Sequence, residues 1–77
     1  MQFQAEYTDT FGGEANYSWV RRETFEADQN ATNALIMRRA KAAVGLSGVR
    51  GKTEDMGDTL AFRPYGIHAV LFVTPEY

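Results

Sequence analysis

The segment Gly45–Thr53 carries the residue types of a phosphate-binding loop. It reads GLSGVRGKT and ends in the Gly-Lys-Thr whose amides and lysine would hold phosphate oxygens. The spacing argues against that chemistry, because the motif needs a glycine at position 46 and the chain has Leu46 there. The segment also follows a predicted helix, whereas a phosphate loop opens one. We interpret Gly45 as the end of a helix, and nucleotide chemistry is our third hypothesis.

Titratable groups offer little else for catalysis or metal binding. Three carboxylates surround a predicted turn at Glu54, Asp55 and Asp58, but the alternating ligands and distant glutamate of a calcium loop are absent from the sequence. His68 is the single histidine and there is no cysteine, which excludes a multi-histidine site and a cysteine nucleophile. We therefore predict no enzyme, and no catalytic, cofactor-binding or metal-ligating residue.

Basic and aromatic residues on predicted strands are typical of a surface on which single-stranded bases stack. A domain of 77 residues, however, needs its large aromatic side chains in the core, and the formal net charge of −2 provides no overall attraction to phosphates. Direct nucleic-acid binding is therefore our second hypothesis. The residues that would carry it are Tyr7, Tyr17, Trp19, Arg21, Arg22, Arg50 and Lys52.

Alternation of apolar and polar residues predicts the strands that would position these groups. Paired glycines at positions 12 and 13 predict a hairpin loop between the first two strands, which makes them antiparallel. Apolar residues on both faces of the last strand predict that it is central in its sheet. The five predicted strands are Gln2–Thr8, Ala15–Thr24, Val49–Glu54, Thr59–Arg63 and Ile67–Val73.

A helix is predicted over Ala31–Val44, where apolar residues recur at a spacing of three and four. Asp28, Asn30 or Thr32 could cap its start, and Gly45 suits the left-handed residue that closes a helix. The sequence thus predicts a single α+β domain over residues 1–77, with element order ββαβββ, a mostly antiparallel sheet, and one helix packed on one face.

One helix covers only one face of a sheet, so the other face would be open to water or to a partner. Val70 and Phe72 would lie on that open face. The alternatives there are an interface with another protein, a homodimer, or a helix packed on that face, and we favour an interface. The basic residues near the helix end are either solvated charges that complement the helix dipole or contacts for an acidic partner. Our candidates for partner binding are Arg38, Arg39, Lys41, Arg50, Lys52, Val70 and Phe72.

No stretch of the sequence approaches the roughly 18 apolar residues of a membrane helix, and its start has no basic and apolar signal region. We therefore expect a cytoplasmic protein that does not bind membranes.

Three runs of residues carry a family resemblance. They are Thr8–Arg22 (TDTFGGEANYSWVRR), Arg39–Arg50 (RAKAAVGLSGVR) and Arg63–Gly66 (RPYG). These runs resemble small uncharacterised proteins of proteobacterial genomes, prophages and mobile elements. The resemblance implies a stand-alone phage or mobile-element protein, and it implies no catalytic residues.

By analogy of size, shape and context, the chain is also similar to anti-CRISPR inhibitors, many of which bind a surveillance complex and block target recognition. Our first hypothesis is therefore a non-enzymatic inhibitor. It would bind a larger protein or ribonucleoprotein complex of the bacterial host and block target recognition by steric occlusion. The second hypothesis remains a small nucleic-acid-binding regulatory protein.

Overall fold

The computed structural model describes residues 1–9 and 20–76. In this part of the chain one helix follows two strands and precedes three more, so the structure is α+β and its element order matches the prediction. The predicted hairpin loop and the first half of the second predicted strand, with Tyr17 and Trp19, lie outside the described residues. The elements are β1 (Gln2–Asp9), β2 (Val20–Glu26), α1 (Asn33–Ala43), β3 (Gly51–Asp55), β4 (Leu60–Pro64) and β5 (Ala69–Glu76).

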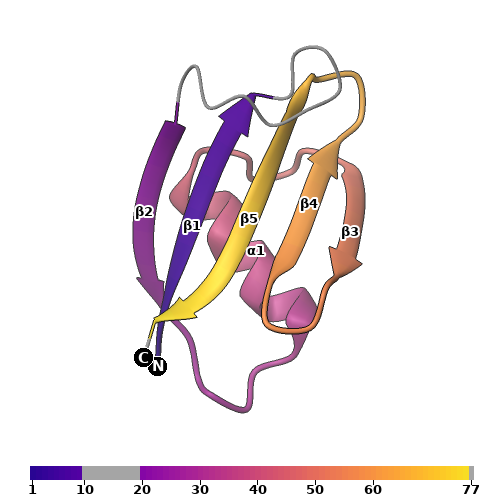
Figure 1. Cartoon of the computed structure of the whole chain (residues 1–77). Helices are drawn as coiled ribbons and strands as arrows, with labels where there is room; N and C mark the ends of the chain where they lie inside the picture. The colour runs from indigo at the N-terminus through magenta and orange to yellow at the C-terminus, as the bar shows by residue number, and fades with distance from the viewer. Residues whose placement is uncertain (10–19, 77) are drawn as a thin grey trace.

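The strands form one five-stranded antiparallel sheet in the order β2-β1-β5-β4-β3. The predicted central position of the last strand is confirmed, because β5 pairs with β1 on one side and with β4 on the other. The helix crosses behind the sheet in Figure 1, and the first and last described residues lie together at one end of it. The sheet therefore joins two hairpin-like pairs, β2-β1 and β4-β3, through the last strand of the chain.

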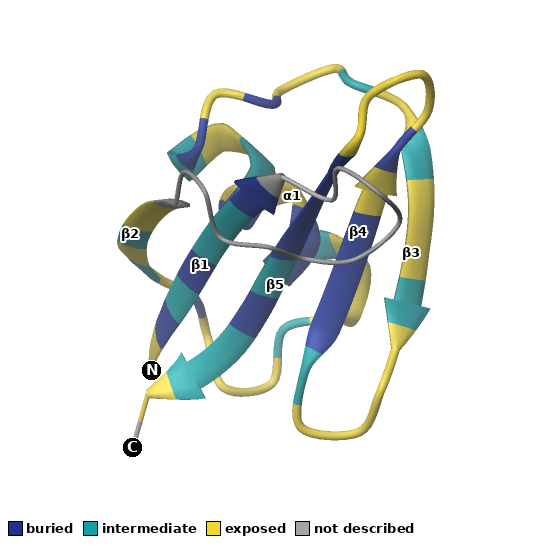
Figure 2. Ribbon diagram, turned by 45° about the horizontal axis from the view of Figure 1, so that its top comes forward, coloured by how far each residue is buried: buried dark blue, intermediate teal, exposed yellow. Residues whose placement is uncertain are grey.

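The core lies between the helix and the sheet. Phe3 stacks on its cross-strand partner Phe25, with ring centroids 5.5 Å apart. Figure 2 shows burial concentrated in β5 and β4 and at alternating positions of β1, while β3 is largely exposed or intermediate. Apolar residues of the helix and of four strands or their flanking loops form one buried cluster: Phe3, Ala5, Ala27, Ile36, Met37, Ala40, Val44, Leu46, Leu60, Phe62, Leu71 and Val73.

The helix begins and ends through local hydrogen bonds. Thr32 is the N-cap, and its hydroxyl accepts a hydrogen bond from the Leu35 amide at 3.2 Å. At the other end Gly45 has φ +79°, its amide donates to Ala42, and the Leu46 amide donates to Lys41 at 2.7 Å. This is the paired pattern that a left-handed glycine allows after a helix. The predicted helix was thus right in type and C-terminal signal but began two residues too early.

The two turns of the C-terminal half explain where the strand predictions were wrong. After β3, the Asp55 carboxylate accepts from the Gly57 amide at 3.0 Å and closes the expected tight turn. After β4, the turn extends through His68, and the Ala69 amide donates to Ile67 at 3.0 Å. The strand predicted over Ile67–Val73 therefore begins at Ala69, and His68 lies exposed in the turn.

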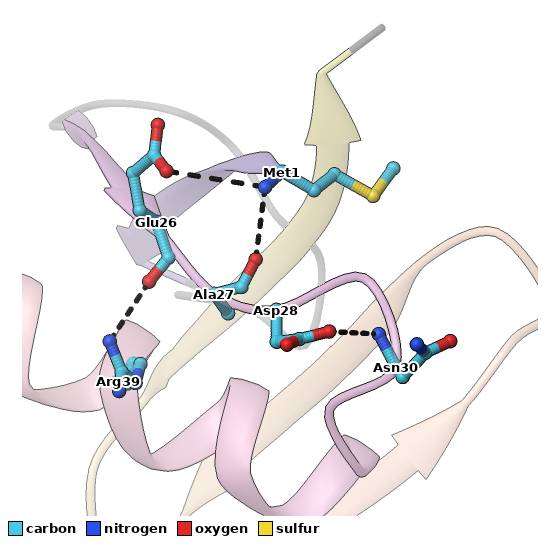
Figure 3. A network of polar contacts seen from close by, with 6 residues as sticks. All are labelled: Met1, Glu26, Ala27, Asp28, Asn30 and Arg39. Atoms are coloured by element: carbon cyan, nitrogen blue, oxygen red, sulfur yellow. Dashed lines mark hydrogen bonds and ion pairs between the residues drawn. The ribbon is translucent and has the colours of Figure 1, made fainter.

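Polar contacts tie the N-terminus to the connection between β2 and α1 (Figure 3). The Met1 amino group donates to the Ala27 carbonyl at 3.1 Å and lies 4.0 Å from the Glu26 carboxylate. Arg39 of the helix donates to the Glu26 carbonyl at 3.1 Å, which links α1 to the end of β2. The hydrogen bonds between Met1 and Ala27 extend the β1-β2 ladder by one residue pair beyond the two strands.

Candidate protein-binding surface

The sheet face turned toward the viewer in Figure 1 is the face opposite the helix. Because side chains alternate along a strand, the even-numbered residues of β1 and β5 share this face. The register places them in cross-strand rows. One row runs Thr24, Gln4, Thr74 and the next runs Arg22, Glu6, Phe72, Ala61.

Phe72 lies at the centre of this face and is half-buried. Beside it the surface is hollowed by about 510 Å³, a volume in the range of binding clefts. Met56, from the turn between β3 and β4, stands at the edge of the hollow and is 51% exposed. The lining residues are Gln4, Glu6, Met56, Thr59, Phe72 and Thr74. An aromatic side chain and a flexible thioether are thus surrounded by groups that can form hydrogen bonds.

The charged group in the hollow is held in place by its neighbour. Arg22 donates through Nε to the Glu6 carboxylate at 2.8 Å, across the β1-β2 pair. Both side chains are partly exposed, so this pair contributes little to stability and mainly fixes the position of the carboxylate. In the rest of the lining the polar groups are the uncharged ones of Gln4, Thr59 and Thr74.

Val70 does not belong to the accessible part of this face. Its side chain is 0% exposed, as is that of its β1 partner Thr8, and Ala61 is 1% exposed. The expectation that Val70 and Phe72 form an exposed pair is therefore wrong for Val70. Val70 lies on the central strand and is fully buried, so only the Phe72 end of the face is accessible.

The three basic residues at the helix end do not form one patch. Arg39 points to β2, where it donates to the Glu26 carbonyl. Lys41 points the other way, donates to the Val49 carbonyl at 2.6 Å and lies 4.5 Å from the centre of the Phe62 ring. Arg38 is exposed on that same side. Positions three apart share a side of a helix, whereas adjacent positions diverge, which separates Arg38 and Lys41 from Arg39.

A second hollow, of about 420 Å³, lies between α1 and β3. At one end of this hollow the side-chain amide of Asn33 donates to the Asp55 carboxylate at 3.1 Å. At the other end the Lys41 ammonium group donates to the Val49 carbonyl. Sequence analysis missed this groove, because it arises from the angle between the helix and an edge strand rather than from a local pattern. Its lining residues are Asn33, Ala34, Met37, Arg38, Lys41, Thr53 and Phe62.

The two basic candidates near the start of the third strand have different contacts. Arg50 precedes β3, is exposed, and accepts a backbone hydrogen bond from Tyr65 at 3.0 Å. Lys52 lies on the face opposite the helix, directly across from Arg63 of β4 and 3.9 Å from Glu54. Lys52 and Arg63 carry like charges and face each other across the strand pair, which is unfavourable on a sheet.

The described residues do not assemble the aromatic and basic surface that nucleic-acid binding would need. Tyr7 faces the helix side of the sheet, where burial raises the pKa of its phenol. Arg22 and Lys52 share the other face, but they lie on β2 and β3, at opposite edges of the sheet. Tyr17 and Trp19 lie outside the described residues.

Gly51 explains part of the glycine-rich segment. A Cβ atom at this position would lie 2.3 Å from the Arg63 carbonyl oxygen and 2.7 Å from the Phe62 ring. The glycine is therefore required by the close approach of β3 to β4. Together with Gly45 at the helix end, it gives the segment a structural explanation.

Comparison with known proteins gave no match: no family model, no curated protein and no solved structure was significantly similar to this chain. Among residues 1–9 and 20–76, the helix is neither long nor apolar enough to cross a membrane. The same described residues bring together no group of three histidine, cysteine or acidic side chains that could hold a metal ion.

Proposed function

We propose that this protein is a non-enzymatic inhibitor that docks on a larger protein or ribonucleoprotein complex and blocks it by steric occlusion. The observation that carries the proposal is the accessible half of the face opposite the helix, where half-buried Phe72 and exposed Met56 border the hollow. Aromatic and methionine side chains within a polar rim are characteristic of protein interfaces.

The partner would insert an apolar side chain beside Phe72 and present hydrogen-bonding groups to Gln4, Thr59 and Thr74. This chemistry fits a folded protein surface better than nucleic acid, because the charged group that lines the hollow is the carboxylate of Glu6. The sequence resemblance to phage and mobile-element proteins supports a bacterial defence complex as the target. An anti-CRISPR protein acting in the host cytoplasm is the form of the proposal that we favour.

A plaque assay tests the proposal in bacteria whose CRISPR–Cas system protects them from a phage. Expression of the chain should restore plaque formation, and the purified chain should bind the purified surveillance complex. Phe72→Lys should remove both effects, since it places a charge in the centre of the interface. Tyr65→Lys is the matched control, because Tyr65 is 69% exposed in the turn after β4, away from the hollow.

Restored plaque formation by both variants would contradict the assignment of the surface. Failure of the unaltered chain to bind complexes of the CRISPR systems tested, together with unchanged phage protection, would contradict the proposed target.

A further inference from the structure

β3 is an edge strand, and within residues 1–9 and 20–76 its outer backbone groups have no hydrogen-bond partner. The Tyr65 amide donates to Arg50 and the Met56 amide donates to Thr59, so even-numbered residues along this segment direct their backbone groups toward β4. In an antiparallel ladder the alternate residues direct theirs to the opposite side. The amides and carbonyls of Gly51, Thr53 and Asp55 therefore point outward, toward the place of a further strand.

Charges on β3 are arranged with opposite signs around Thr53. Lys52 precedes it and Glu54 follows it, and both side chains lie on the face opposite the helix. If two such strands pair antiparallel with Thr53 opposite Thr53, each Lys52 lies directly across from Glu54 of the second copy. That pair is of the non-hydrogen-bonded type, in which side chains approach most closely.

The same pairing would relieve an unfavourable contact within one chain. Lys52 faces Arg63 across the β3-β4 pair, and its nearest carboxylate, Glu54, lies 3.9 Å away on its own strand. A second copy would place another carboxylate on the open side of Lys52. The two lysines and two glutamates would then form a cluster in which unlike charges alternate.

The helix side of β3 also accommodates a second copy. In the register centred on Thr53, Asp55 of one copy lies opposite Gly51 of the other. Gly51 has no side chain, so the carboxylate meets no steric obstacle there. It would approach the end of the groove that carries Lys41 and Arg38, the basic side of α1.

The other edge of the sheet lacks these properties. On β2 the Arg22 charge is already paired with Glu6 at 2.8 Å, and the Glu26 carbonyl accepts from Arg39. One outward backbone acceptor is therefore used within the chain, and both basic side chains of that strand have acidic partners, since Arg21 lies 3.6 Å from Glu23. β3 is the edge that remains available.

We propose that two copies of this chain associate through antiparallel pairing of β3 with β3, around a twofold axis at Thr53. The two sheets then become one continuous sheet with both helices on the same side. Exposed sheet edges readily add a strand in this way, and a twofold interface requires the self-complementary charges that β3 carries. This inference does not rest on the proposed inhibitor function, because Phe72 lies on β5, which β4 separates from β3.

Sedimentation of the full chain over a range of concentrations measures the association. Lys52→Glu and Glu54→Lys should each weaken the dimer roughly tenfold, because each places like charges opposite one another at two symmetric positions. The double variant Lys52→Glu/Glu54→Lys should restore the original dissociation constant. An equimolar mixture of the two single variants should form a heterodimer, since both of its cross-strand pairs are again of opposite charge.

Amide hydrogen exchange locates the interface. The amides of Gly51, Thr53 and Asp55 should exchange more slowly as the protein concentration rises, because these amides would then donate to the second copy. Thr53→Pro should abolish the dimer and keep the fold, since its amide does not pair with β4. Circular dichroism of each variant checks the fold.

A chain that remains monomeric up to about 1 mM would overturn the proposal. A dimer whose β3 amides exchange at the monomer's rate would overturn it as well. So would a dimer whose dissociation constant is the same in Lys52→Glu, Glu54→Lys and the unaltered chain. Phe72→Lys should leave the dimer intact, so loss of inhibitor activity in that variant is distinguishable from loss of pairing.

Discussion

Two residues of the same strand and the same face, Val70 and Phe72, differ sharply in their environment. Val70 is fully buried between its neighbours, whereas Phe72 borders the hollow. Alternation along a strand fixes the direction of a side chain but not its exposure, which depends on what surrounds it in the fold. Arg38 and Arg39 differ for another reason: adjacent positions on a helix point in different directions, so each side chain meets a different neighbouring strand.

This difference predicts that the same substitution lowers stability much more at Val70 than at Phe72. Val70→Lys should lower the free energy of unfolding by about 3 kcal/mol or more, because it buries a charge without a partner. Phe72→Lys should lower it by about 1 kcal/mol, since the lysine stem can remain on the sheet while its ammonium group reaches water. Urea denaturation of both variants measures the two values. Equal losses would show that Phe72 is a core residue, and the protein-binding surface would then have to lie elsewhere.

At the scale of single elements, the helix and its caps show how local signals act. Thr32 is the residue that caps α1, and the buried residues Ile36, Met37 and Ala40 follow it at helical spacing. Sequence analysis named Thr32 among three candidate caps without choosing between them. Asp28 instead accepts from the Asn30 amide at 2.8 Å in the preceding turn. Which of the three residues caps the helix is decided by the path of the chain after β2, which places Asp28 in a turn and Thr32 at the start of α1.

The cap predicts a measurable contribution to stability. Thr32→Ala should lower the free energy of unfolding by about 1 kcal/mol, because the Leu35 amide loses its acceptor. Thr32→Ser keeps the hydroxyl and serves as the matched control, with a change near zero. Thermal unfolding followed by circular dichroism at 222 nm reports helix and sheet together. An alanine variant as stable as the serine variant would show that the hydroxyl does not act as a cap.

Strand predictions succeeded where one local pattern sufficed. Alternation identified β1 and the faces of Leu60 and Phe62, and two-sided apolar character correctly placed β5 in the centre. The groove between α1 and β3 could not be predicted, because it joins Arg38 to Thr53 through tertiary packing. The start of β5 was missed for a related reason: Ile67 is apolar, yet its carbonyl is used in the turn after β4.

At the scale of the whole molecule, the first and last strands meet in the middle of the sheet. Gln2 is the register partner of Glu76, so the ends of the described chain lie side by side (Figure 1). Each of the pairs β2-β1 and β4-β3 is local in sequence, but only β5 joins them. The hollow beside Phe72 spans β1, β5 and the β3-β4 turn, so the candidate surface exists only when the whole sheet has formed.

The distribution of charge over the whole molecule predicts how it behaves toward nucleic acid. The formal net charge is −2, and the basic side chains Arg22 and Lys52 each lie next to a carboxylate, at 2.8 and 3.9 Å, on opposite edges of the sheet. A protein that binds through phosphate contacts needs cations gathered along one path, and its affinity falls steeply as salt rises. Direct titration with single- and double-stranded DNA and RNA near physiological salt should therefore show no binding at micromolar concentrations.

The same titration decides between the two leading functions. If nucleic acid binds tightly, the affinity should fall with salt, and Arg50→Glu together with Lys52→Glu should abolish it, since these are the basic residues at the start of β3. That result would replace the inhibitor proposal with the nucleic-acid-binding alternative. Charge reversal at Arg38 is the matched comparison: it should leave any such binding unchanged, because Arg38 lies on the helix side of the sheet, while Lys52 lies on the other face.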